Sequence, residues 1–262
     1  TFDDNGSFTL SGGTFTAPNA SGSFTVAGSF TTSGSPTFNS NSGTLTMDGS
    51  LVGSFSLNAP GITFTQVNIT RSTNNGGYHF TIASGTTVPL GNSPTIVYAA
   101  DSNGIFTNNG TITVGTGTFT LTFANGAVFT NNGTITANSI TSWVTPTGAI
   151  TNAGTISMTG ASTFDFNGSF SNSSASSVFS TASTPTMTVA GSLTVTSGST
   201  FPANATVTFD GALAGSFSLD ASGVTFTQVT INRPTNNGGY TFSIASGTTV
   251  PLGNSPTIVY AA

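Results

Sequence analysis

A long internal repeat constrains this chain more than any other feature. Residues 53–100 return almost unchanged as residues 215–262, an offset of 162, and 40 of the 48 aligned pairs are identical without a gap. Weaker matches extend upstream, since Thr1-Phe2-Asp3 matches Thr163-Phe164-Asp165. A fixed long period is typical of a repeat array. We therefore expect residues 1–162 to be one full unit of a continuous array, residues 163–262 to be the first 100 residues of the next, and a stretch resembling 101–162 to follow.

The composition excludes several classes of protein. Only 3% of the residues are charged, with two Arg, seven Asp or Glu and a net charge of -5, whereas about a quarter is usual for a globular domain. Without a basic cluster there is no electrostatic footprint for nucleic acid. The absence of Cys removes disulfides and thiol ligands, and no apolar run approaches the roughly 20 residues that span a bilayer as a helix. The 22 Phe residues nevertheless supply enough apolar surface to fold.

Apolar and hydroxyl residues alternate along most of the chain, as in Thr118-Phe-Thr-Leu-Thr-Phe123 and Val224-Thr-Phe-Thr227. A period of two places the apolar residues on one face of a strand and Thr or Ser on the other. Helix-favouring Glu and Lys are absent and Gly recurs throughout. The sequence therefore predicts an all-β protein with essentially no helix.

A shorter unit lies within the long one: a Gly followed by alternating hydroxyl and apolar residues, recurring at intervals near 20 to 23 residues, as from Gly110 to Gly133 and on to Gly154. This spacing predicts one coil of a parallel β-solenoid, or β-helix, per interval. About eight coils at roughly 4.8 Å each would give a rise of about 38 Å per long unit. The alternative is a string of tandem immunoglobulin-like β-sandwiches of roughly 80 residues each, which explains the alternation but not the short unit.

Three segments in the middle of the chain carry a resemblance to a known class: Phe106-Thr-Asn-Asn-Gly-Thr-Ile-Thr-Val114, Phe129-Thr-Asn-Asn-Gly-Thr-Ile-Thr-Ala137 and Ile150-Thr-Asn-Ala-Gly-Thr-Ile-Ser-Met158. They resemble the repeats of large β-helical surface proteins such as filamentous haemagglutinin and autotransporter passenger stalks. The resemblance is densest over residues 104–160. It implies a secreted, fibrous and often adhesive cell-surface protein, and it carries over no functional residues, because the repeats of that class are scaffolding.

The few charged residues recur with the repeat. Asp48 and Asp210 are equivalent, as are Arg71 and Arg233, and each Arg follows its Asp by 23 residues, near one coil. We therefore expect Asp48 to pair with Arg71, and Asp210 with Arg233, across neighbouring coils. An exposed pair of this kind is worth less than about 1 kcal/mol, so its role would be to set the register.

Asn109 and Asn132 are also 23 residues apart, and their amides could stack as a ladder at a coil corner. The alternative is that Asn-Gly serves only turns that need a positive φ. Trp143 and the tyrosines (Tyr78, Tyr98, Tyr240 and Tyr260) could line a glycan-binding face, but packing in the core or at corners is favoured. His79 is replaced by Thr241 in the second unit, which argues against a catalytic or metal role.

The expected function is structural: a segment of an extracellular or cell-surface fibre or filament built from tandem repeats. Its partners would be further copies of the repeat, joined covalently or head to tail, with lateral fibre contacts or surface glycans in addition. With seven acidic residues and one His there is little material for acid–base catalysis, so we expect no enzyme activity and no cofactor or metal. The alternative is an adhesin stalk or glycan-binding module on the cell surface.

Overall fold

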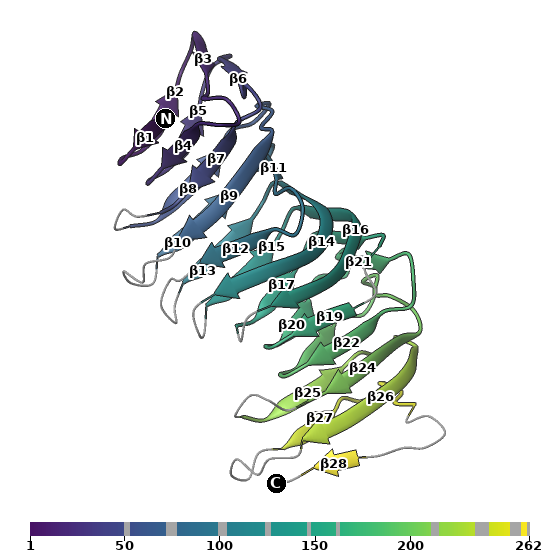
Figure 1. Ribbon diagram of the computed structural model, residues 1–262. Coiled ribbons are helices and arrows are strands. Elements are labelled where there is room, and N and C mark those ends of the chain that lie inside the picture. The colour runs from purple at the N-terminus through teal and green to yellow at the C-terminus, as the bar shows by residue number, and fades with distance from the viewer. Residues whose placement is uncertain are drawn as a thin grey trace.

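The computed structural model is an elongated stack of β-coils, with the two termini at opposite ends (Figure 1). It describes residues 1–49, 53–71, 78–98, 104–123, 127–145, 148–160, 163–210, 215–233, 241–251 and 258–260. None of these residues is helical, and hence none belongs to a helix that could cross a membrane. All pairings between the described strands are parallel.

The largest sheet has 15 strands and runs the length of the stack. Its main path is β1 (Phe2–Asp4), β4 (Ser23–Val26), β7 (Thr44–Met47), β9 (Gln66–Arg71), β12 (Thr95–Tyr98), β14 (Thr111–Phe123), β16 (Thr134–Thr145), β19 (Thr163–Phe166), β22 (Thr186–Val189), β24 (Ala205–Phe209), β26 (Phe226–Arg233) and β28 (Ile258–Tyr260). The long strands β14 and β16 continue around a corner. For that reason they also pair with strands of a third side: β14 with β11 (Thr87–Pro89) and β16 with β18 (Thr155–Met158). The third side continues with β21 (Val178–Thr181), which pairs with β18.

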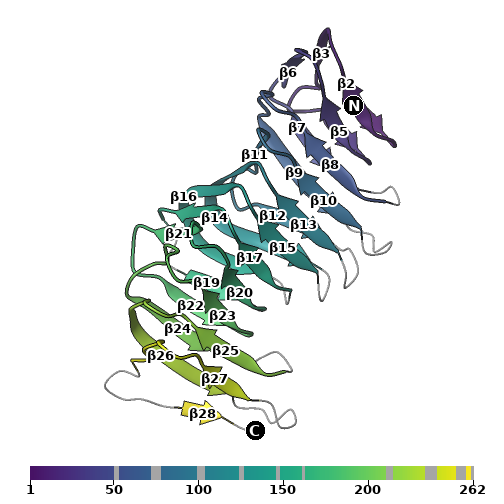
Figure 2. The same cartoon turned by 180° about the vertical axis from the view of Figure 1, so that it is seen from behind.

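A second sheet of 11 strands covers the opposite side of the core and faces the viewer in Figure 2. In order its strands are β2 (Phe8–Leu10), β5 (Phe30–Thr32), β8 (Phe55–Asn58), β10 (His79–Ile82), β13 (Ile105–Asn108), β15 (Val128–Asn131), β17 (Ile150–Asn152), β20 (Phe170–Asn172), β23 (Leu193–Val195), β25 (Phe217–Asp220) and β27 (Phe242–Ile244). A two-stranded sheet, β3 (Thr14–Thr16) with β6 (Thr37–Asn39), forms the third side near the N-terminus.

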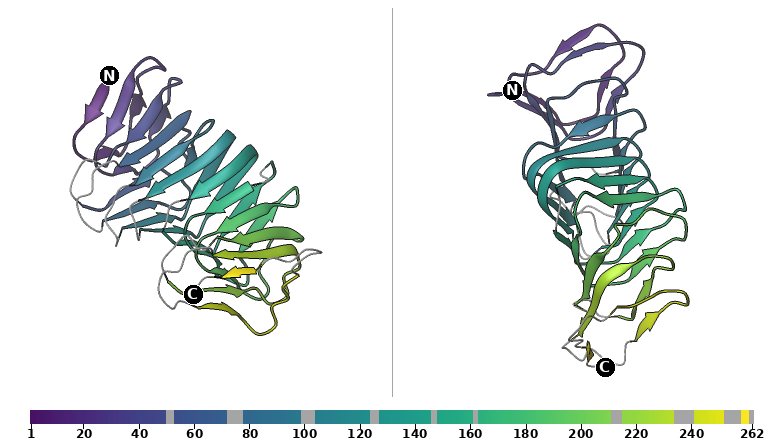
Figure 3. Two further views of the ribbon diagram at one scale, coloured as in Figure 1. Left: turned by 60° about the horizontal axis from the view of Figure 1, so that its bottom comes forward. Right: turned by 90° about the vertical axis from the view of Figure 1, so that its right-hand side faces the viewer.

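The coils stack into an elongated body (Figure 3), and their buried apolar side chains form one continuous core cluster. The residues of β4 alternate between exposed or half-buried hydroxyls and buried Phe24 and Val26, as the period of two predicts. Buried aromatic rings meet from coil to coil, for example Phe80 with Phe106 at 4.9 Å between centroids and Phe106 with Phe129 at 5.2 Å. Each coil thus buries its apolar face against its neighbours, which makes the stack cooperative along its axis.

The predicted parallel β-solenoid is confirmed, and the tandem β-sandwich alternative is wrong, because sandwiches of that type are built from antiparallel strands. The predicted number of coils needs correction. Phe2 in β1 and its repeat-equivalent Phe164 in β19 are separated by seven steps of the large sheet, not eight. Steps between paired residues vary from 20, as from Met187 to Val207, to 27, as from Ile231 to Ile258. Seven strand spacings give a rise of roughly 34 Å per unit.

Candidate binding groove

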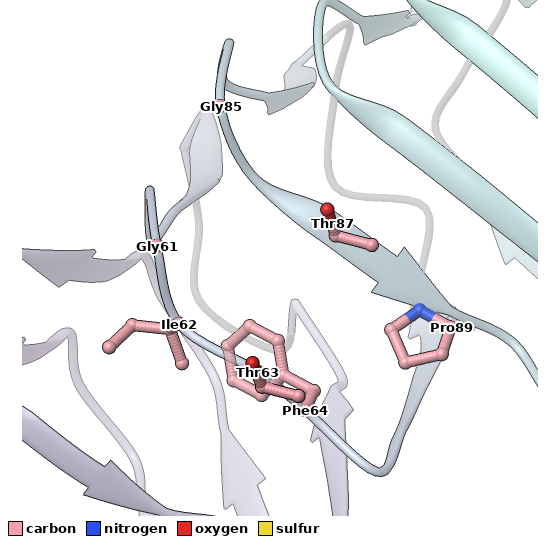
Figure 4. Close-up of a pocket in the computed structure, with 7 residues that line it drawn as sticks. All are labelled: Gly61, Ile62, Thr63, Phe64, Gly85, Thr87 and Pro89. Carbon is pink, nitrogen blue, oxygen red and sulfur yellow. The ribbon is translucent and has the colours of Figure 1, made fainter.

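A surface groove lies on the third side of the coils, between the segment that precedes β9 and strand β11. Its lining residues are Gly61, Ile62, Thr63, Phe64, Gly85, Thr87 and Pro89, and its volume is about 310 Å³ (Figure 4). Ile62, Phe64 and Pro89 give it apolar walls, while the hydroxyls of Thr63 and Thr87 lie at exposed positions.

A proline explains why the coils part at this place. The N–H of Leu90 donates to the carbonyl of Thr113 in the following coil at 2.9 Å. Because backbone groups of successive strand residues point to alternate sides, the backbone of Pro89 faces the preceding coil. Proline has no N–H to donate. Residues 62–64 have no strand assignment, and the space between them and β11 is the groove.

The turns that lead into the groove replace a ladder hydrogen bond with a side-chain bond. The N–H of Ala59 donates to Oγ1 of buried Thr86 at 2.9 Å, and Gly61 and Gly85 have φ of 74° and 77°. Glycine adopts such positive φ values without the strain that a Cβ would cause. The groove is therefore a specified feature of the local sequence.

A second groove is lined by the equivalent residues one unit later, although here Phe226 begins β26 (Phe226–Arg233) and residues 249–251 have no strand assignment. Its lining residues are Gly223, Val224, Thr225, Phe226, Gly247, Thr249 and Pro251, and its volume is about 330 Å³. Each stands 162 residues after its counterpart, and only Ile62 is replaced, by Val224. The N–H of Val229 donates to the carbonyl of Pro251 at 2.8 Å, so this proline faces the preceding coil, and Ala221 N–H donates to Thr248 Oγ1 at 3.0 Å. Each unit therefore carries one equivalent groove.

Arg71 is placed differently from the sequence expectation. It is 0% exposed, because it follows Val67 and Ile69 on the inward face of β9. Its guanidinium lies 5.5, 5.3 and 5.8 Å from the ring centroids of Phe55, Tyr78 and Tyr98. Nη1 donates to the Gly53 carbonyl at 3.3 Å, while Nε and Nη2 are buried without a hydrogen-bond partner. Three desolvated cation–π contacts offset part of the cost of burying this charge.

The strand register bears on the expected partner of Arg71. Thr46 pairs with Asn68 and Met47 with Ile69, a step of 22 residues. Continuing that register places Gly49 rather than Asp48 beside Arg71, and adjacent residues of a strand point to opposite faces. The side-chain pairing of Asp210 with Arg233 stays a prediction, because the side chain of Arg233 lies outside the described part of the chain.

Asp165 is the acidic residue with a resolved electrostatic perturbation. Partial burial raises its pKa above the ordinary value of 3.8, the negative charge of Asp210 raises it further, and a hydrogen bond with Asn167 acts in the opposite direction. Both causes of the increase disfavour the charged carboxylate. Asp165 and Asp210 thus repel one another across the coils.

Asn109 and Asn132 are joined as expected for a ladder: Asn132 Nδ2 donates to Asn109 Oδ1 at 3.0 Å, at an exposed corner. The positive-φ alternative is wrong for their Asn-Gly turns, because neither Gly110 nor Gly133 has a positive φ. These glycines are needed for close approach. A Cβ on Gly133 would lie 2.1 Å from the carbonyl oxygen of Gly110 in the preceding coil.

A second ladder of asparagine amides is fully buried and was not among the sequence predictions. Its rungs are Asn108, Asn131, Asn152 and Asn172, and successive Nδ2-to-Oδ1 bonds measure 2.7, 2.8 and 2.7 Å. Each amide also donates to a backbone carbonyl, those of Thr134, Thr155, Val178 and Thr200. The signal was available: with a period of two, Phe106 and Asn108 share the inward face, and the motif Ile150-Thr-Asn-Ala-Gly keeps the first Asn and loses the second.

The aromatic residues weighed as a glycan-binding face lie mainly inside. Trp143 and Tyr98 are 0% exposed, and the hydroxyl of Tyr98 donates to the carbonyl of Tyr78. His79 is exposed, and its backbone N–H donates to Oγ of Ser54 at 3.1 Å. Tyr240 and the side chain of Tyr260 lie outside the described part. Core packing, the favoured alternative, holds for Trp143 and Tyr98.

Comparisons of the chain with protein-family profiles, with curated proteins and with solved structures found no match. The residues themselves therefore carry the functional argument. They offer an elongated stack of coils, a hydroxyl-rich exterior with few charges and one such groove per repeat. Among the described residues no group of three or more His, Cys, Asp or Glu side chains could hold a metal.

Proposed function

We propose that this chain is a structural segment of an extracellular or cell-surface fibre assembled from tandem 162-residue units. The observation that carries the proposal is that one unit spans seven whole coils, so that Phe2 and Phe164 occupy equivalent positions in the same sheet. Successive units of this kind continue the same stack of coils. The number of units therefore sets the length of the fibre, at roughly 34 Å per unit.

The parallel coil construction also supports the proposal. In a parallel stack the first and last coils present strand edges that pair with a further coil, so units extend covalently or head to tail into an open fibre. The β-solenoid is the architecture of the haemagglutinin-like and autotransporter-like surface fibres that residues 104–160 resemble. On that likeness we place the fibre outside the cell, where a chain without Cys depends on packing and hydrogen bonds instead of disulfides.

Antibodies raised against the 262-residue chain provide the test, applied to the intact source cells by immunogold electron microscopy. We expect label along the shafts of surface filaments, and X-ray diffraction from oriented filaments with a strong reflection at the strand spacing of about 4.8 Å along the fibre axis. Label confined to the cell interior, or filaments whose strands lie parallel to the axis, would contradict the proposal.

A further inference from the structure

We propose that the two grooves are lateral contact sites, each occupied by a second copy of this chain lying alongside the first. The inference rests on the proposed fibre function and adds to it the partner of one defined surface. We call this surface the proline groove; it comprises the seven residues around Pro89 and their seven counterparts around Pro251.

The size of the groove requires a repeating partner. A specific interface that is stable on its own buries more than about 1,000 Å² and typically involves about 20–30 residues on each side, whereas one groove is lined by seven residues. Stable association therefore needs several grooves to be engaged by one partner, since linked weak sites gain affinity together.

The spacing of the grooves identifies that partner. Equivalent lining residues are separated by 162 residues and seven coils, or roughly 34 Å along the axis. A partner that fills successive grooves must repeat at the same distance. A second copy of this chain has that period by construction, whether it runs parallel or antiparallel to the first.

The chemistry of the groove fits a hydroxyl-rich partner with few charges, such as this chain. None of the lining residues is charged, and Thr63 and Thr87 in the first copy, with Thr225 and Thr249 in the second, lie exposed. The low charge of the chain leaves little electrostatic repulsion between copies. Lateral pairing would bundle single fibres into thicker ones.

Arginine in both grooves tests the inference, because it places a charge where two copies must meet. The variant Thr63→Arg/Thr225→Arg is compared with the control Thr95→Arg/Thr186→Arg, whose positions are exposed on β12 and β22 of the large sheet. Self-association of the 262-residue chain is measured by analytical ultracentrifugation, and electron microscopy separates side-by-side pairs from end-to-end chains by particle width. We expect paired rods for the wild type and the control, and at least tenfold weaker pairing for the groove variant.

Circular dichroism verifies that each variant keeps its strands, and Thr87→Asp/Thr249→Asp provides a second groove variant if the first fails to fold. Pairing that survives in both groove variants, or that is lost only in the control, would overturn the inference. Wild-type rods that join end to end but remain single at all concentrations would also overturn it while leaving the fibre function intact. Absence of both kinds of association, combined with an intracellular immunogold signal, would instead count against the fibre function.

Discussion

Asn108 donates a hydrogen bond from Nδ2 to Oδ1 of Asn131 at 2.7 Å, with both amides fully buried. The bond joins two neighbouring coils inside the core, where no water competes for it. Asn131 repeats the same donation to Asn152 at 2.8 Å. A side chain that is misplaced by one coil position would leave several amides unpaired, which costs more than the bonds themselves contribute. The buried ladder therefore specifies the register of the coils.

Replacement of Asn131 by Leu is expected to destabilise the protein by about 2–4 kcal/mol, because it leaves the Asn152 oxygen without its donor and removes an acceptor from Asn108. The exposed rung Asn132 provides the control, since Asn132→Ala removes one solvent-accessible bond and should cost less than about 1 kcal/mol. Urea unfolding followed by circular dichroism measures both. Equal midpoints for the two variants would show that the buried ladder has no special weight.

Glycine at position 133 is expected to be indispensable. The Cβ of Gly133→Ala would lie 2.1 Å from the carbonyl oxygen of Gly110, so the coils must separate locally, and we expect a loss of more than about 2 kcal/mol. Gly12 has open space around its Cβ position and no positive φ. The matched Gly12→Ala variant should be neutral or stabilising by less than about 1 kcal/mol. Thermal unfolding curves distinguish the two, and a tolerated Gly133→Ala would refute the close-packing argument.

Replacement of Arg71 by an apolar residue is expected to preserve or increase stability, unlike the substitutions at Asn131 and Gly133. Replacing a buried charge that lacks full hydrogen bonding with an apolar side chain of similar volume is often neutral or stabilising by about 1–4 kcal/mol. We therefore expect Arg71→Met to unfold at the same or a higher urea concentration. Arg71→Lys should be destabilising, because an ammonium is more strongly hydrated and packs less well against the three rings. A large loss of stability in Arg71→Met would mean that the cation–π contacts outweigh the cost of burial.

The pH dependence of stability should be small and should include a contribution from Asp165. Its pKa is raised in the folded state above the ordinary 3.8, so the native state binds this proton more tightly than the unfolded chain does. Stability should accordingly fall as pH rises from 3.8 through the raised pKa, and then level off. Asp165→Asn should remove this part of the profile and raise stability at neutral pH. Urea midpoints measured across acidic to neutral pH test this, and an unchanged profile in Asp165→Asn would refute it.

Much of the fold could be predicted from local pattern, because a period of two decides which face of a strand is apolar. Phe24 and Val26 on β4 are buried as that rule requires. The same rule places Asn108 and Arg71 inside, but polar and charged residues are so rarely buried without partners that composition argued for the surface. The rings around Arg71 come from residues 7, 16 and 27 positions away, and the stacked amides from residues 20 to 23 positions away. The alignment of these groups depends on the length of each coil.

The sequence by itself determined the repeat, the absence of helix and the alternation that makes a coiled β-stack, since these follow from residue periodicity and backbone propensity. Only the tertiary structure decided the coil lengths. The first three steps of the large sheet are 22, 21 and 22 residues from Phe2 to Val67, whereas those from Phe164 to Val229 are 23, 20 and 22. One unit therefore spans seven coils although individual coils differ in length, because an extra residue is accommodated between the paired strands while the strands keep their register. The groove beside Pro89 has the same origin, since a missing N–H opens a gap only where another coil would have accepted it.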